Sequence, residues 1–75
     1  MDKIVLFKKD DGSVWYSYRG KEEPVSKLNI PLFAQLYKQL GQLPSFGYPQ
    51  DDIELNVLAK TLAENIKQTA SQLMF

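Results

Sequence analysis

The sequence contains no cysteine and no histidine. The lack of cysteine excludes disulfides and thiolate–zinc sites. The lack of histidine removes the commonest metal ligand and the commonest general base near neutral pH. A chain of 75 residues leaves much of its surface in water, and domains of this size often depend on a disulfide, a metal or a partner subunit. Of these three ways to stabilise a small domain, association with another chain is the one that the composition still allows.

An excess of charge of one sign is also lacking, since nine Lys and Arg side chains balance nine Asp and Glu side chains. The signs are mixed along the chain: residues 1–28 hold six basic and five acidic groups, and residues 29–75 hold three and four. A broad field that attracts nucleic acid or an anionic membrane is therefore not expected. A net charge near zero also gives little protection against self-association.

Long hydrophobic runs are missing as well. The run Ile-Val-Leu-Phe at residues 4–7 is too short for the core of a signal peptide or for a membrane span. We therefore expect a single cytoplasmic domain over residues 1–75, with no membrane partner. Hydrophobic residues still make up 44% of the chain, which favours a folded protein over a disordered one.

A β-hairpin is predicted for the first part of the chain. Residues 3–8 and 14–19 are short apolar segments rich in β-branched and aromatic side chains, which is typical of strands. Between them, Gly12 supplies the positive φ that a hairpin loop needs. Residues 22–27 are the candidate for a third strand, and Pro24 would suit only a sheet edge because it lacks an N–H.

A first helix is predicted to follow the hairpin. Asn29 is the expected N-cap, Pro31 fits the first turn, and Gly41 stands at the usual C-terminal stop. Helical spacing gives this segment one continuous apolar face. Its members are Leu32, Phe33, Leu36, Tyr37 and Leu40.

A second helix is predicted from residue 52 to about residue 72, after a proline-containing loop at 42–50. Asp51 is expected to begin a capping box with Glu54, because both acids suit a helix start. Its apolar stripe consists of Leu55, Leu58, Leu62, Ile66 and Leu73, interleaved with Ala59, Ala63 and Ala70. The predicted fold class is α+β, an antiparallel hairpin sheet of two or three strands followed by two helices, in the order β-β-(β)-α-α.

The hairpin register decides which side chains share a face of the sheet. A three-residue loop over 10–12 places Leu6 opposite Tyr16. One face then carries Ile4, Leu6, Val14, Tyr16 and Tyr18, and the other carries Val5, Phe7, Trp15 and Ser17. A two-residue loop, Asp11-Gly12, regroups these side chains but leaves apolar groups on both faces.

Two helices placed together cover only one face of so small a sheet. The second face would then expose Trp15, Phe7 and Val5, and monomers rarely expose a large contiguous apolar patch. Three arrangements would cover it: the apolar tail at residues 73–75, a second helix placed on the opposite side of the sheet, or a partner chain.

Catalytic chemistry is not expected. The serines at 13, 17, 26, 45 and 71 have no histidine to activate them. The adjacent carboxylates at 10–11, 22–23 and 51–52 are accounted for by a turn, a charged strand edge and a helix cap. There is no phosphate-binding glycine loop and no calcium-loop spacing. We therefore predict no enzyme activity, no cofactor and no metal.

The leading functional hypothesis is a non-enzymatic interaction or regulatory module that docks to another protein chain or to its own copy, forming a homo-oligomer. Aromatic side chains are enriched among binding hot spots. The residues expected to bind the partner are Trp15 and Phe7 on the sheet, with Phe46 and Tyr48 in the loop. The two loop aromatics also have a structural interpretation, as a lid over the open end of the core.

The alternative hypothesis is binding of single-stranded nucleic acid. Strand aromatics stack on unpaired bases, and lysine or arginine side chains hold the phosphates. The residues that would do so are Tyr16, Tyr18, Lys8, Lys9, Arg19 and Lys21. Because acidic residues at 10–11 and 22–23 reduce the positive field in the same stretch, docking to a protein is the preferred hypothesis.

Overall fold

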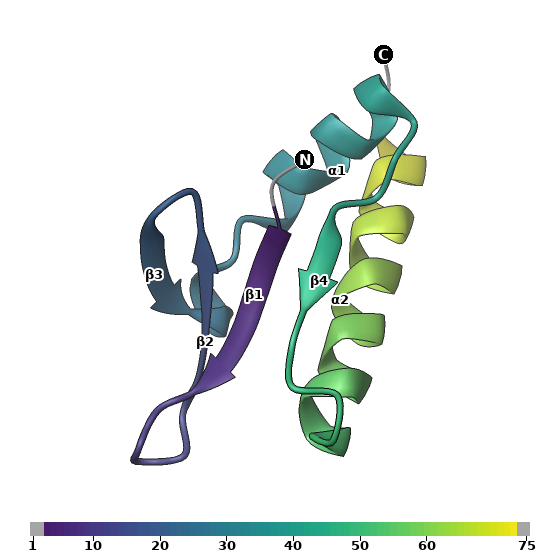
Figure 1. Cartoon of the computed structure of the whole chain (residues 1–75). Coiled ribbons are helices and arrows are strands. Elements are labelled where there is room, and N and C mark those ends of the chain that lie inside the picture. Colours follow the sequence, from purple (N-terminus) through teal and green to yellow (C-terminus); the bar gives the residue numbers. More distant parts are fainter. Residues whose placement is uncertain (1–2, 74–75) are drawn as a thin grey trace.

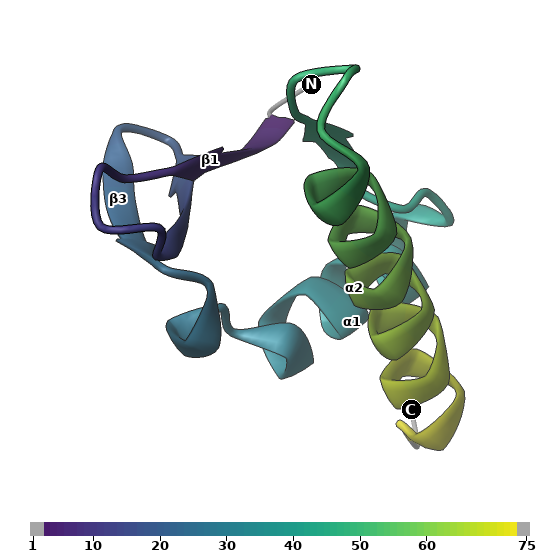
Figure 2. The ribbon, with the colours of Figure 1, turned by 90° about the horizontal axis from the view of Figure 1, so that it is seen from below.

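The computed structural model describes residues 3–73. Its elements in chain order are β1 (Lys3–Lys8), β2 (Val14–Tyr18), β3 (Lys21–Pro24), the 3₁₀ turn η1 (Val25–Lys27), α1 (Ile30–Leu40), β4 (Ser45–Gly47) and α2 (Ile53–Gln72). The strands form one mixed sheet in the order β3-β2-β1-β4. Both helices lie on the same side of this sheet (Figures 1 and 2). The predicted α+β class is confirmed.

The β1–β2 hairpin has the register predicted for a three-residue loop, with Leu6 opposite Tyr16. The N–H of Lys9 donates to the carbonyl of Ser13 at 2.9 Å and closes the loop. Gly12 has a φ of 86°, the left-handed conformation that such a loop requires. The Asp11 carboxylate accepts hydrogen bonds from the hydroxyl and the backbone N–H of Ser13 at 2.6 and 2.9 Å, and these bonds, that from the hydroxyl first, lower the pKa of the Asp11 carboxyl.

The third strand exists but is shorter than the stretch 22–27. β3 pairs antiparallel with β2 and ends at Pro24, which lies on an edge strand as the missing N–H predicts. Residues 25–27 form the 3₁₀ turn η1 instead, and the N–H of Leu28 closes this turn on the carbonyl of Val25 at 3.0 Å. The turn leads the chain from the sheet to the start of α1.

A fourth strand, β4, lies where the sequence predicts only a loop. It runs parallel to β1, with Ile4 beside Phe46 and Val5 beside Gly47. Parallel pairing needs a long connection, which here consists of β2, β3, η1 and α1. Pro44 and Pro49 flank the strand, and because proline cannot donate to a ladder they keep it short.

Both helices begin with a side-chain cap. The side-chain Oδ1 of Asn29 accepts from the N–H of Leu32 at 3.1 Å, as predicted. The cap of α2 is Asp52, whose carboxylate accepts from the N–H of Leu55 at 3.1 Å, so the prediction of Asp51 was wrong by one residue. The reason is the turn that precedes the helix: the Asp52 N–H donates to the Pro49 carbonyl at 3.1 Å, and this turn already includes Asp51.

The core lies between the sheet and the two helices. Its buried members are Ile4, Leu6, Tyr16, Leu28, Phe33, Ala34, Leu55, Ala59, Leu62, Ile66 and Ala70. Because both helices contribute to one cluster with one face of the sheet, α2 does not cover the opposite face. Leu73 packs against this same core, and the tail residues 74 and 75 lie outside the described residues. Within residues 3–73, neither helix combines the length and apolar character needed to cross a bilayer.

Candidate functional site

The outer face of the sheet, which faces away from the helices, carries two of the predicted partner-binding residues. Phe7 and Trp15 lie opposite each other and are half-buried, while Val5 keeps 42% of its surface exposed. The Lys9 ammonium lies 3.5 Å from the centre of the Trp15 ring, and the indole N–H donates to the Ser13 hydroxyl at 2.9 Å. Lys9 and Ser13, at the ends of the hairpin loop, therefore cover part of the Trp15 indole, which the sequence predicted to be exposed to water.

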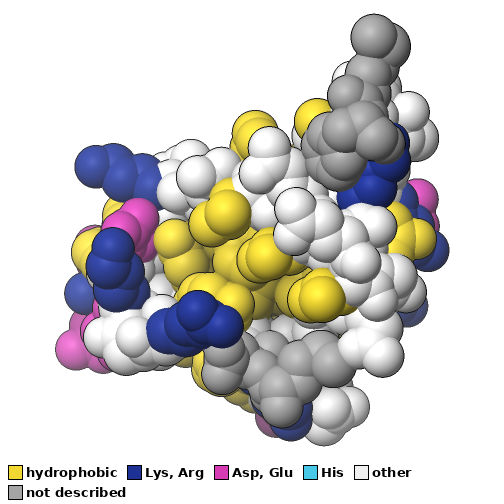
Figure 3. All heavy atoms as spheres, turned by 90° about the horizontal axis from the view of Figure 1, so that it is seen from above, with side chains coloured by type: hydrophobic (Ala, Val, Ile, Leu, Met, Phe, Trp, Pro, Cys, Tyr) yellow, Lys and Arg dark blue, Asp and Glu magenta, His cyan; other side chains and the backbone are white. Residues whose placement is uncertain are grey.

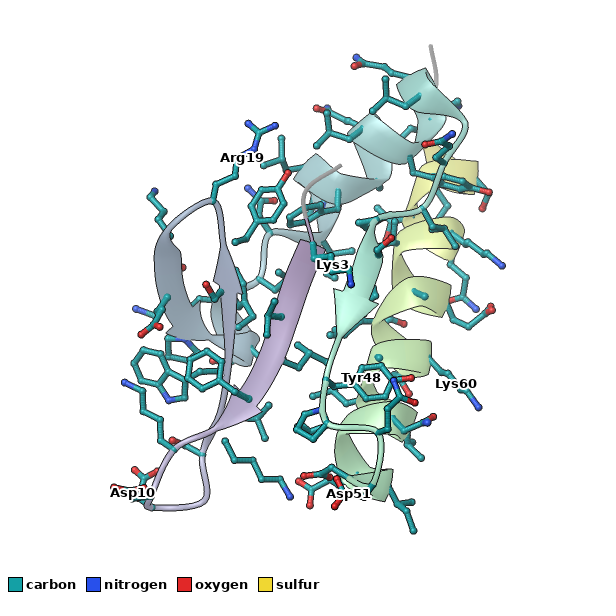
Figure 4. The ribbon with its side chains drawn as sticks, viewed as in Figure 1. Lys3, Asp10, Arg19, Tyr48, Asp51 and Lys60 are labelled. Atoms are coloured by element: carbon teal, nitrogen blue, oxygen red, sulfur yellow. The ribbon has the colours of Figure 1, made fainter. Side chains whose placement is uncertain are left out.

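The other two predicted partner-binding residues lie beside the core. Phe46 and Tyr48 are half-buried and pack against the core cluster. The pairing of Phe46 with Ile4 places it on the helix-covered side of the sheet, and Tyr48 lies beside α2 (Figure 4). This placement favours the interpretation of both aromatics as a lid over the core.

The six residues proposed for nucleic-acid binding divide into two groups. Lys8 and Lys9 lie near the β1–β2 loop, where Lys9 covers Trp15. The Lys8 ammonium lies 3.3 Å from the Glu54 carboxylate and 3.4 Å from that of Asp52, and these bonds, that to Glu54 first, raise the pKa of Lys8. The remaining four residues line a single groove at the other end of the hairpin; they are Tyr16, Tyr18, Arg19 and Lys21.

This groove, called here the α1 groove, lies between the β2–β3 loop and α1. A hollow of about 450 Å³ is lined by Tyr16, Tyr18, Arg19, Lys21, Glu23, Lys27, Asn29, Leu32 and Phe33. A second hollow of about 120 Å³ shares Tyr18, Arg19 and Phe33 and adds Leu36, Leu40, Gln42 and Pro44. Viewed toward this end of the molecule, Figure 3 shows an apolar area with Lys and Arg side chains beside it.

A stripe of leucines on α1 forms the apolar side of the groove. Leu32 and Leu40 keep 45% and 67% of their surface exposed, and Leu36 between them is half-buried. The sequence assigns all three to one continuous apolar face of α1. In the structure Phe33 and the neighbouring Ala34 are buried, and Leu36 packs against the core while remaining half-buried. The reason for the exposed leucines is visible in Figure 1, where α1 extends past the ends of the strands, so the sheet does not reach its whole length.

Basic side chains border the other side of the groove. Arg19, Lys21 and Lys27 line it together with a single acidic residue, Glu23, so its lining carries three positive charges and one negative. The Tyr16 hydroxyl donates to the Glu23 carboxylate at 3.4 Å. Burial, with the nearby Glu23 charge, raises the pKa of Tyr16 above its ordinary value.

Tyr18 is held between two neighbours at the centre of the groove. Its ring meets that of Phe33 edge to face, with ring centres 5.1 Å apart and planes at 77°. The guanidinium carbon of Arg19 lies 5.5 Å from the Tyr18 ring centre. Both contacts fix the tyrosine in the wall of the groove, so its ring is not free to swing out as a stacking platform.

The turn that carries Arg19 has an unusual composition. Tyr18 pairs with Lys21, so the loop between the strands has two residues, Arg19 and Gly20, with φ of 51° and 79°. Two positive φ values are the pattern of a type I′ turn, for which Asn-Gly is the favoured sequence. An arginine at the first position is strained by the positive φ, and its guanidinium lines the groove.

Two kinds of groove residue were not predicted from the sequence as part of a site: the leucine stripe of α1, and Lys27 in η1. The leucine stripe could have been found from the width of the apolar face of α1. That face combines the Leu32–Leu36–Leu40 row with the Phe33–Tyr37 row, which is more than one contact with the core needs. Nothing in the sequence signals Lys27, because its place follows from the path of η1.

Within residues 3–73, no three acidic side chains are close enough together to hold a metal ion. Comparison of the chain with protein-family models, with curated proteins and with solved structures gave no match.

Proposed function

We propose that this protein is a non-enzymatic interaction module that binds an apolar, acidic segment of another protein chain in the α1 groove. One observation carries the proposal: exposed leucines on α1 and three cations border the same groove. Exposed apolar patches with a polar rim are typical of protein interaction sites. The proposal keeps the docking function expected from the sequence and moves the binding surface from the outer sheet face to the α1 groove.

The two sides of the groove would contribute differently to binding. The Leu32–Leu36–Leu40 stripe offers an i,i+4 ridge against which apolar side chains of a partner helix pack. Arg19, Lys21 and Lys27 place positive charge along the groove, which attracts a partner that carries carboxylates. The apolar contact therefore supplies most of the affinity, and the charges orient the partner and raise the rate of association.

Nucleic-acid binding has weaker support at the same groove. Stacking on bases needs accessible ring faces. Tyr16 keeps only 8% of its surface exposed, and the Tyr18 ring is engaged by Phe33 and Arg19. The proposal therefore favours a protein segment over a single strand.

The test is an NMR titration of the ¹⁵N-labelled protein with a synthetic amphipathic peptide, leucine on one face and glutamate on the other. We expect saturable shifts of the Tyr18, Arg19, Lys27 and Leu36 amides. A matched peptide with lysine in place of glutamate is expected to bind at least about tenfold more weakly, because it meets like charges.

Two further titrations complete the design. Leu40→Gln removes an exposed leucine without opening the core, so it should weaken binding of the acidic peptide and leave the fold intact. A thymidine oligonucleotide should produce no saturable shifts. If the oligonucleotide shifts the groove amides and the acidic peptide does not, the protein-docking proposal is wrong and the nucleic-acid alternative replaces it.

A further inference from the structure

The end of the molecule opposite the α1 groove carries a second exposed apolar pair. Ile53 and Val57, one turn apart at the start of α2, keep 80% and 57% of their surface exposed. Figure 4 places Asp51 and Asp10 at this end of the molecule and Arg19 at the other. The molecule is elongated, with extents of 42 × 23 × 21 Å, so the two apolar surfaces are well separated.

The charge around this pair is opposite to that of the groove. Residues 8–11 and 51–54, called here the acidic end, contain five acidic residues and two lysines, which gives a net charge of −3 (2 − 5). Lys8 already lies against Asp52 and Glu54, and Lys9 against Trp15. Counted in the same way, residues 19–27 beside the α1 groove contain three basic and two acidic residues, which gives a net charge of +1 (3 − 2). Each end therefore combines exposed aliphatic side chains with a net charge, positive beside the groove and negative at the acidic end.

We infer that the partner in the α1 groove is a second copy of this chain, which inserts its acidic end. Ile53 and Val57 of one copy would pack on Leu36 and Leu40 of the next, since both pairs form i,i+4 ridges of the kind that interdigitate between helices. The carboxylates of the acidic end would face Arg19, Lys21 and Lys27. This inference rests on the proposed function and names the partner of the same site.

The contact joins two different surfaces, so each copy keeps one groove and one acidic end available. Such head-to-tail contacts build rows of copies rather than closed symmetric pairs. Because the apolar part of the contact is small, the association is weak and rises with protein concentration. Salt weakens it, because exposed opposite charges are screened.

The experiment is sedimentation equilibrium of the wild type and two variants at up to about 1 mM protein, where even weak association becomes visible. Leu32→Glu places an acid in the groove; position 32 lies in the first turn of α1, where acids are well tolerated, so the fold should persist. Ile53→Gln combined with Val57→Gln removes the apolar pair from the acidic end. Because glutamine is a good helix former, α2 should remain helical in this variant. Circular dichroism verifies that each variant is folded.

We expect the average mass of the wild type to rise with concentration and each variant alone to stay monomeric. An equimolar mixture of the two variants should form dimers, because one supplies an intact groove and the other an intact acidic end. The dimer should grow no further, since each partner has lost its other surface. Val5→Thr, which trims a similarly exposed aliphatic side chain on the outer sheet face, is the matched control and should associate like the wild type.

Three results would overturn the inference: a wild type that stays monomeric throughout, a mixture of variants that fails to associate, or loss of association in Val5→Thr. The proposed function is judged separately by the acidic peptide. If that peptide binds the groove while the wild type remains monomeric, the groove is a docking site and the self-partner is wrong. If the peptide also fails to bind, both proposals fall.

Discussion

The guanidinium carbon of Arg19 lies 5.5 Å from the centre of the Tyr18 ring, although the Arg19 backbone holds a left-handed φ of 51°. The left-handed conformation costs most side chains about 1–2 kcal/mol and is tolerated better by asparagine. A residue chosen for the turn alone would be asparagine. The arginine therefore carries a backbone strain that asparagine would reduce, at a position where it places a cation beside the α1 groove.

Arg19→Asn is therefore expected to stabilise the fold and weaken docking. Relief of the strained φ should raise the free energy of unfolding by about 0.5–1 kcal/mol, measured by urea denaturation. Affinity for the acidic peptide should fall several-fold in the same sample. Arg19→Lys is the control, because it keeps the charge and the strain. A less stable Arg19→Asn protein would show that the arginine serves the fold instead.

Trp15→Ala is expected to lower stability without unfolding the chain. The indole is half-buried, contacts Lys9 and donates to Ser13, so its removal should cost about 2 kcal/mol. Peptide binding at the groove should be unchanged by NMR titration. If Trp15→Ala abolishes self-association while Leu32→Glu leaves it intact, the docking surface is the outer sheet face. If the chain unfolds outright, Trp15 belongs to the core.

Ile66→Ala and Val57→Ala should differ sharply, although both shorten aliphatic side chains of α2. Ile66 is fully buried, so its truncation leaves a cavity and should cost about 2–5 kcal/mol, a large part of the 5–15 kcal/mol typical of whole domains. Val57 is exposed, and its truncation should change stability by less than about 0.5 kcal/mol. Thermal unfolding of the two variants checks this; comparable losses would contradict the packing described.

Acid should weaken the start of α2 through Asp52. The bond from the Leu55 N–H, and then the contact with Lys8, hold the pKa of the Asp52 carboxyl below its ordinary value of 3.8. Because the folded pKa is the lower one, the stabilisation is fully present above the unfolded pKa and is lost as the pH falls through the folded value. Asp52→Asn keeps a cap acceptor without the charge.

The measurement is urea denaturation of both proteins between about pH 5 and pH 2. The stability of the wild type should fall more steeply over this range than that of Asp52→Asn. Equal slopes would mean that other carboxylates dominate the acid response and that the Asp52 cap contributes little to it.

The sequence predicts most of the fold because local signals agree with the tertiary structure. The turn at Gly12, the cap at Asn29 and the stop at Gly41 each stand where backbone chemistry requires them. β4 escapes prediction because its three residues, in a four-residue segment between Pro44 and Pro49, show no strand periodicity, and only pairing with β1 makes them a strand. The shift of the cap from Asp51 to Asp52 depends on a turn that two adjacent aspartates do not reveal.

The candidate site is predicted only in part. Tyr18, Arg19 and Lys21 are neighbours in a hairpin, so the sequence alone brings them together. The leucines that complete the groove come from α1, and whether a helix face is covered depends on how far the sheet reaches. That length is set by tertiary pairing, which periodicity does not report.

The parallel pairing of β4 with β1 has a kinetic consequence. Residues 3 and 45 meet across some forty intervening residues, and that loop closes at an entropic cost which local contacts must first offset. The β1–β2 hairpin and α1 should consequently assemble early, and β4 should add last. The backbone amides of residues 45–47 would then exchange with solvent hydrogen faster than those of the hairpin. The β1–β4 pairing would be the first part of the native structure to unfold locally.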